Sequence, residues 1–297
     1  MKQEIICHIG FPKTGTTFLQ TTIFPNIEGV NYIKSNILKD ILHDLIEKDD
    51  SFYDEDKVHA ELAKRHIANS RMLFSYEPLT GHHLKTEFAN RSQIARRLKS
   101  ANVSKVIITI RNQTDILEST YKQYIKSGGV LKISEFFDFN GNPNPWFYIN
   151  YFNYERIIDV YSNIFGRDNV KVLQYENLFL NGNSMKNELE GGFEIERMKF
   201  KGVSELKVNK SLSNFSIKLL RIINHLTFNN YRPSSLINKK LSTQFFYKIL
   251  KRINIPTNEK KLISKYENDI CTYFSKSNSL LEEKNNIILH EKYCTIL

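Results

Sequence analysis

The chain of 297 residues is 41% apolar and 12% aromatic, so it can bury one large core and is not expected to be disordered. Its longest apolar runs, such as residues 106–110 and 219–223, are far shorter than the roughly 20 residues that cross a bilayer, so no transmembrane helix is expected. The net charge of +10 lies in the last third, where residues 201–297 hold 17 Lys and Arg against 7 Asp and Glu.

The uneven charge allows two interpretations. It can mark an acidic partner, such as a nucleic acid or an anionic membrane face, or it can be an ordinary lysine-rich surface in contact with solvent. The residues alone leave both open.

The first residues predict a strand rather than a signal peptide. Residues 1–9 contain one lysine and a short apolar run, without a long apolar segment or a small-residue cleavage site. Cys7, Cys271 and Cys294 are odd in number and widely spaced, which predicts a reducing compartment rather than a disulfide framework. We therefore expect a cytoplasmic protein.

Short apolar runs alternate with helical patterns along the first 180 residues. The runs are rich in β-branched residues and too continuously apolar for half-exposed antiparallel strands. Strands are predicted at 4–9, 72–75, 106–110 and 170–174, and helices at 16–23, 56–68, 92–99, 115–126 and 148–164. Such alternation implies βαβ crossovers, and hence an α/β, P-loop-like three-layer fold with a central parallel sheet.

The last third is predicted to be a helical C-terminal extension. Apolar residues recur at helical spacing over 212–226 and again over 262–274. Residues 141–145, which are Gly, Asn and Pro, predict a loop that can line a site. No repeat or low-complexity linker divides the chain, so we expect a single domain over 1–297, with a nucleotide-binding core in 1–180 and the helical part in 205–297.

The segment 8–19 runs from an apolar strand through a glycine-containing turn into an amphipathic helix. Gly10 and Gly15 allow the backbone to turn and to approach a ligand closely, while free N–H groups at the start of the helix favour an anion. The loop also offers side-chain donors, namely Lys13, Thr16 and Thr17. This combination predicts a phosphate cradle.

The loop departs from the ordinary Walker A pattern G-x-x-x-x-G-K-[ST]. Gly10 and Gly15 have the right spacing, but Thr16 stands where the lysine belongs, and Lys13 lies upstream. The third predicted strand ends in Arg111, whereas a nucleoside triphosphatase needs an Asp at such a strand end to hold magnesium. Because an arginine attracts a further anionic group, the residues predict a metal-free site for a phosphate-rich ligand.

These residues resemble two motifs of sulfotransferases that use 3′-phosphoadenosine 5′-phosphosulfate (PAPS). Residues 12–19 resemble the 5′-phosphosulfate loop, and 107–111 followed by Ser119 resemble the 3′-phosphate motif. Residues 169–178 resemble the last core strand and turn, so the resemblance covers about the first 180 residues. It implies binding of PAPS, and of its product 3′-phosphoadenosine 5′-phosphate (PAP), by Pro12, Lys13, Thr14, Gly15, Thr16, Thr17, Arg111 and Ser119.

The resemblance also assigns residues outside these motifs. Lys210 and Ser211 lie where the family brings a C-terminal loop over the nucleotide, although the segment departs from the Arg-Lys-Gly form of some members. Glu77 resembles the glutamate that acts as base in glycan sulfotransferases, the alternative being a solvated or salt-bridged glutamate. His82 and His83 are either further candidates for the base or ordinary loop histidines.

Other polar and aromatic residues have more than one interpretation. Glu176 is predicted to be structural, at the turn beside Asn177. Trp146, Tyr148 and Tyr151 either stack on a sugar ring or belong to the core.

We therefore expect a sulfotransferase that moves a sulfuryl group from PAPS to a hydroxyl of a bacterial cell-surface glycan or its lipid-linked precursor. Lys13 would stabilise charge on the departing phosphate, and Glu77 would deprotonate the hydroxyl. We expect no metal and no nucleic-acid partner, and a peripheral contact with the anionic inner membrane face. A magnesium-dependent nucleotide kinase and a non-catalytic basic binding protein are the alternatives.

Overall fold

A computed structural model describes residues 4–65, 67, 70–81, 84, 91–140, 142, 146–180, 184–196, 198–200, 212–227, 242–252 and 260–295. Four residues with a predicted role, His82, His83, Lys210 and Ser211, lie outside the described residues. Their predicted roles therefore stay predictions.

The core of the chain is a five-stranded sheet in which every pair of neighbouring strands is parallel. The order is β2-β3-β1-β4-β5, and the strands are β1 Ile5–His8, β2 Val30–Ile33, β3 Arg71–Ser75, β4 Lys105–Ile110 and β5 Val170–Gln174. The four predicted strands and the parallel α/β class are confirmed. The sequence did not predict β2, because this edge strand is half-exposed throughout and includes the polar Asn31.

Alternate residues of the central strands pack on opposite faces of the sheet, as a buried parallel sheet requires. Ile5 and Cys7 of β1 belong to a large core that includes residues of α4, Arg91–Ser100, and α7, Tyr154–Phe165. Ile6 of β1 belongs to a second core with Leu19, Ile23 and residues of α9, Ser184–Phe193. These layers confirm the three-layer architecture.

Helices fill the connections between the strands. They are α1 Thr16–Phe18, continued by a π-helical turn at Leu19–Ile23, α2 Lys39–Ile46, α3 Glu55–Ala63, α5 Gln113–Lys126, α6 Ile133–Phe136 and α8 Tyr175–Phe179. The predicted helix at 148–164 starts later, because Ile149–Phe152 forms a 3₁₀ turn before α7. The sequence predicted neither α2 nor α9.

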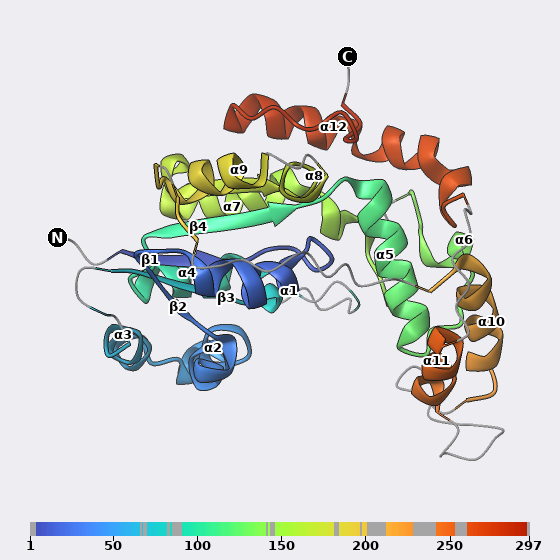
Figure 1. Ribbon diagram of the computed structural model, residues 1–297, viewed down its shortest axis with the longest axis horizontal. Helices are drawn as coiled ribbons and strands as arrows, with labels where there is room; N and C mark the ends of the chain where they lie inside the picture. The colour runs from blue at the N-terminus through green and yellow to red at the C-terminus, as the bar shows by residue number, and fades with distance from the viewer. Residues whose placement is uncertain are drawn as a thin grey trace.

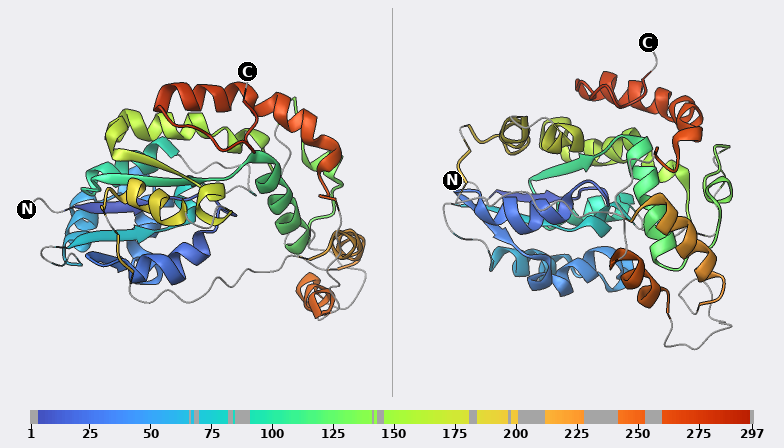
Figure 2. Two further views of the ribbon diagram at one scale, coloured as in Figure 1. Left: turned by 45° about the horizontal axis from the view of Figure 1, so that its top comes forward. Right: turned by 45° about the vertical axis from the view of Figure 1, so that its right-hand side comes forward.

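The C-terminal part is helical, as expected. Helix α10, Asn214–Asn224, and helix α11, Thr243–Arg252, pack on each other and on α5. The last helix, α12, Glu267–Asn285, lies along α7 (Figure 2). Among the described residues, no helix is both long enough and apolar enough to cross a membrane.

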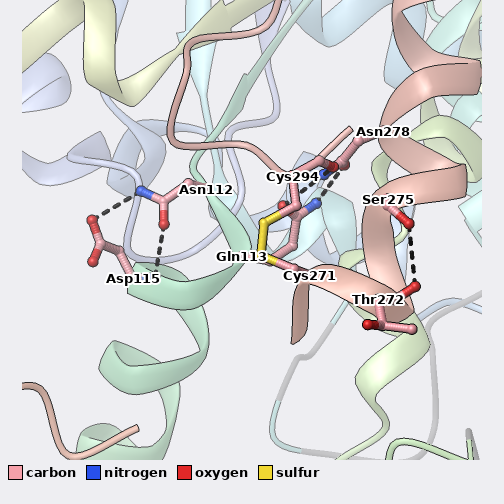
Figure 3. The surroundings of a disulfide bond; sticks show 8 residues. All are labelled: Asn112, Gln113, Asp115, Cys271, Thr272, Ser275, Asn278 and Cys294. Carbon is pink, nitrogen blue, oxygen red and sulfur yellow. Dashed lines mark hydrogen bonds between the residues drawn. A yellow bond between two sulfur atoms is a disulfide. The ribbon is translucent and has the colours of Figure 1, made fainter. Parts of the chain in front are cut away.

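The C-terminal tail turns back along α12 and is held there by a disulfide. Cys271 of α12 is bonded to Cys294, and the Asn278 side chain donates to the Cys294 carbonyl at 2.8 Å (Figure 3). Asn278 also accepts from Gln113 at the start of α5, at 2.8 Å. The prediction of no disulfide is wrong, because a return of the chain brings two distant cysteines together; Cys7 is free and buried.

A buried histidine, the last residue of β1, joins the three central strands. His8 Nδ1 lies 2.7 Å from Ser75 Oγ of β3, and His8 Nε2 lies 2.7 Å from Thr109 Oγ1 of β4. Gln20 donates to the same Ser75 hydroxyl at 2.9 Å. Burial lowers the pKa of His8 from 6.5 to about 3, so the imidazole stays neutral in the folded chain.

This shift predicts a specific loss of stability in acid. Between pH 6.5 and about 3, His8 takes up a proton when the chain unfolds, so its contribution to stability falls as the pH drops below 6.5. The slope approaches about 1.4 kcal/mol per pH unit. His8→Asn, which keeps hydrogen-bonding atoms but does not titrate, should show a correspondingly shallower fall in urea-unfolding free energy. Equal slopes for the two proteins would contradict a neutral buried His8.

Candidate active site

Four segments meet at the carboxyl edge of the sheet because all the strands run in the same direction. The loop 9–15 follows β1, Glu77 lies just after β3, Arg111 follows β4, and α8 follows β5. Figure 1 shows this end of β4 pointing toward α5. Residues far apart in the sequence therefore form one site.

The loop after β1 stays attached to β4 beyond the end of the strand. The amides of Ile9 and Phe11 donate to the carbonyls of Ile107 and Thr109, at 2.9 and 3.0 Å. The Thr14 hydroxyl then donates to the carbonyl of Phe11 at 2.5 Å, which closes the turn. These bonds fix where the loop begins and where α1 starts.

Two residues of the loop have left-handed backbone conformations, Lys13 with φ of 69° and Gly15 with φ of 78°. A Cβ atom at Gly15 would lie 2.3 Å from Cε2 of Phe179, so only glycine fits. A Cβ at Gly10 would lie 2.7 Å from both His8 Cε1 and Thr16 Cγ2. Left-handed residues in a turn direct successive amides toward one side, which is the geometry of an anion-binding nest.

Lys13 and Glu77 are half-buried side chains of opposite charge that lie near each other. Burial raises the pKa of Glu77, and the positive charge of Lys13 opposes this rise. Burial lowers the pKa of Lys13, Glu77 opposes this fall, and the charges of Lys126 and Arg111 add to it. The Thr16 hydroxyl donates to Glu77 Oε1, which ties the carboxylate to the first turn of α1.

Arg111 lies across the loop from this pair. Its Nη1 donates to the Lys13 carbonyl at 3.1 Å, and its guanidinium lies 4.1 Å from the centroid of the Tyr175 ring. Its Nη2 is 3.6 Å from Asp115 Oδ2, at the start of α5. Its Nε is buried and has no hydrogen-bond partner among the residues that the structure describes. A buried donor of this kind is suited to an anionic ligand.

Ser119 lies on α5, about two helical turns beyond Arg111 in the sequence. Asn112 caps the helix, since its Oδ1 accepts from the amide of Asp115 at 2.9 Å. Ser119 is half-buried and lies one turn beyond Asp115 on the same face. Buried Glu176 accepts from both the amide and the side chain of Asn112, at 3.0 and 2.7 Å, which matches a structural role.

The structure adds residues that the sequence did not single out. Tyr175 stacks on Arg111, Phe179 closes against Gly15, and Lys126 is near enough to lower the pKa of Lys13. The signal for Tyr175 and Phe179 was their place after the strand beside β4. Lys126 is seven residues beyond Ser119, so helical spacing places both on one face.

Of the two interpretations of Tyr151, the structure supports a place in the core rather than a sugar platform. Tyr151 is buried, its hydroxyl donates to the Gly81 carbonyl at 2.9 Å, and its ring contacts Phe11 edge to face. It therefore supports the phosphate loop from within the core. Tyr148 accepts a hydrogen bond from Asn150 at 2.6 Å.

A cavity of about 280 Å³ opens near the carboxyl ends of β2 and β3, and Glu77 itself does not line it. Tyr76 and Pro78, the chain neighbours of Glu77, form one wall, and α2 forms the other. Its volume is near the lower end of small-molecule sites, which run from about 300 to 1,000 Å³. Its polar lining comprises Ser35, Asn36, Lys39, His43, Glu47 and Tyr76.

The fold and this edge define a class of protein: an α/β domain with a P-loop-like anion cradle at the carboxyl ends of a parallel sheet. The family comparison is more specific. A family described as "Sulfotransferase domain" matches residues 4–272. The chain belongs to this sulfotransferase family.

One solved structure supports the fold, and a second is a weaker match. A sulfotransferase from Alicyclobacillus acidocaldarius aligns with a TM-score of 0.52 and 13% identity, over 97% of this chain and 98% of that one. The sulfotransferase domain from the curacin biosynthetic pathway aligns with a TM-score of 0.37 and 11% identity, over 98% and 99% of the two chains. No curated protein sequence matches the chain.

Proposed function

We propose that this sulfotransferase uses PAPS as donor and transfers its sulfuryl group to a hydroxyl of a glycan. The observation that carries the donor assignment is the proximity of two cationic residues that follow adjacent strands. Lys13 lies in the loop after β1, and Arg111, which donates to the Lys13 carbonyl, ends β4. A nucleotide with phosphates at both its 5′ and 3′ positions has negative charge to match both.

The donor would lie with its two charged ends on different parts of the site. The amides of the loop, with the hydroxyl of Thr17, would hold the 5′-phosphosulfate, and the Thr16 hydroxyl would join them by turning its proton from Glu77 to the bound donor. Arg111 and Ser119 would hold the 3′-phosphate. The Nε of Arg111, which has no partner among the residues that the structure describes, would donate to it. Lys210 and Ser211 remain proposed contacts that lie outside the described residues.

The reaction needs a proton acceptor and a group that stabilises the leaving phosphate. Glu77 would take the proton of the acceptor hydroxyl, whose oxygen forms the new bond to sulfur. The bond from sulfur to the bridging oxygen breaks, and its electron pair leaves with the 5′-phosphate of PAP. Lys13 would stabilise that developing charge at the moment of transfer. His82 remains a further proposed base outside the described residues.

The acceptor would bind in the cavity near the carboxyl ends of β2 and β3. Hydroxyl, amide and imidazole groups of Ser35, Asn36 and His43 line it, and such groups hydrogen-bond well to sugar hydroxyls. Tyr76 and Pro78, which line this cavity, are the chain neighbours of Glu77. A magnesium-dependent kinase gains no support here, because the end of β4 supplies the cationic Arg111.

Lys13→Ala should lower kcat by about two to three orders of magnitude, the usual scale for losing one donor aimed at developing negative charge. The assay follows transfer of a labelled sulfuryl group from PAPS to a panel of soluble oligosaccharides. Lys64→Ala, which removes an exposed lysine elsewhere, should leave turnover unchanged. Near-normal turnover of Lys13→Ala would remove the lysine from the reaction.

Glu77 should set the acid side of the pH profile. A base works only when ionised, so kcat/KM should fall as the pH drops through the Glu77 pKa, which burial places above 4.5. Glu77→Gln should lose this limb and most of its turnover while still binding PAP, as measured by calorimetry. An acid limb that is unchanged in Glu77→Gln would exclude Glu77 as the base.

A further inference from the structure

The helix pair formed by α10 and α11 stands apart from the nucleotide-binding core. It lies beyond the end of the sheet toward which the strands point, next to α5 (Figure 1). Buried hydrogen bonds hold it in place: Asn224 donates to the carbonyls of Ile125 and Gly129, at 2.8 Å each, and Thr243 donates to Asn224 at 3.0 Å. The pair is therefore anchored on one side and open on the other.

The open faces of both helices carry large apolar side chains. On α10, Phe215 is 68% exposed and Ile222 57%, at a spacing of seven residues, and Leu226, which is 43% exposed, follows just after the helix. On α11, Phe245 is 44% exposed and Ile249 38%, at a spacing of four. These spacings place the side chains on one stripe of each helix, opposite its buried residues. Clustered exposure of this kind marks an interaction surface.

Cationic side chains flank these stripes, and acidic ones are missing from the segment. Residues 206–258 contain ten Lys or Arg and no Asp or Glu, which accounts for the whole net charge of +10. Among the described residues of the pair, Lys218 on α10 and Lys248 and Arg252 on α11 are exposed. The surface therefore combines apolar side chains with positive charge that no acidic residue of the segment offsets.

We propose that this helix pair docks the protein on an anionic lipid bilayer. Amphipathic helices with apolar side chains on one face and Lys or Arg beside them bind at the bilayer interface, where apolar burial and attraction to anionic headgroups act together. A nucleic acid would use the positive charge but leave five large apolar side chains in water. The combination of apolar and cationic side chains therefore favours a membrane over a nucleic acid as the partner of this surface.

Docking in this way brings the active site to the membrane. Lys126, the last residue of α5, lies 4.5 Å from the centroid of the Tyr247 ring on α11, and its charge also lowers the pKa of Lys13. The docking surface and the cradle are thus linked through one helix. Together with the proposed function, on which this step alone rests, the arrangement fits an acceptor glycan that is attached to a lipid.

Sedimentation with vesicles tests the docking. The full chain should bind vesicles of phosphatidylcholine with about one-third phosphatidylglycerol, bind pure phosphatidylcholine at least about tenfold more weakly, and lose affinity as salt is raised. Binding that is equal on both vesicles, or absent from both, would overturn the proposal. Displacement of the bound protein from the vesicles by double-stranded DNA would also contradict it, because DNA would then compete for the same surface.

Two sets of variants separate the apolar and the charged contributions. Phe215→Ser/Ile222→Ser/Phe245→Ser should reduce binding to the anionic vesicles by about tenfold or more, and Lys218→Gln/Lys248→Gln/Arg252→Gln should remove most of its salt dependence. The matched controls are Phe52→Ser/Ile288→Ser, at exposures of 73% and 89%, and Lys34→Gln/Lys64→Gln/Lys186→Gln. Controls that weaken binding as much as the helix-pair variants would contradict a defined surface.

A further measurement separates this proposal from the proposed function. The helix-pair variants should bind PAP as the unaltered chain does, because their residues lie outside the cradle. A chain that binds vesicles but not PAP would leave the docking intact and remove the donor assignment. A chain that binds PAP but no vesicles would keep the donor assignment and overturn the docking.

Discussion

The pairing of β1 with β4 is the constraint on which the site depends. Its parallel register continues past His8, because the amides of Ile9 and Phe11 still bond to the carbonyls of Ile107 and Thr109. The loop 9–15 therefore leaves β1 already aligned with the end of β4. Arg111 consequently reaches the Lys13 carbonyl, although 98 residues separate the two in the sequence.

Burial shapes the chemistry of this edge more than ion pairing does. If the attraction between Lys13 and Glu77 dominated, the pKa of the lysine would rise and that of the carboxylate would fall. Both shifts have the opposite sign, and desolvation is the largest cause of each. A less solvated carboxylate holds a proton more firmly, and a less solvated ammonium interacts more strongly with a nearby anion. Both effects suit proton removal and charge stabilisation in a group transfer.

The C-terminal part combines a concentrated positive charge with a disulfide that holds its tail. The charge excess of the last third is concentrated in one stretch of the sequence, since the segment 206–258 accounts for all of it. The disulfide between Cys271 and Cys294 joins the tail to α12, and Asn278 bonds both to this tail and to Gln113 of α5. The C-terminal part is thereby tied to the helix that carries Ser119.

Much of the fold was predictable because buried parallel strands are short, continuous apolar runs. The run 170–174 predicted β5 to the residue, and the glycine loop predicted the start of α1 at Thr16. The half-exposed β2 was not predictable, because an edge strand with a polar residue lacks that signal.

The site was predictable where a motif holds several residues together, and unpredictable where contacts join distant segments. Glycine spacing located the loop around Lys13, and a strand ending in arginine located Arg111. The Tyr175 ring on Arg111, the Phe179 contact with Gly15 and the Cys271–Cys294 bond depend on how the chain returns on itself. A local sequence pattern does not show which distant segments come into contact.

Calorimetric titration with PAP and with adenosine 5′-phosphate tests the central claim most directly, since the two differ only in the 3′-phosphate that Arg111 is proposed to hold. Hydrogen bonds to charged groups contribute about 1.5–3 kcal/mol, so PAP should bind about 10- to 150-fold more tightly, and Arg111→Met should remove most of that difference. Equal affinities for the two nucleotides, or no binding of PAP at all, would contradict the account.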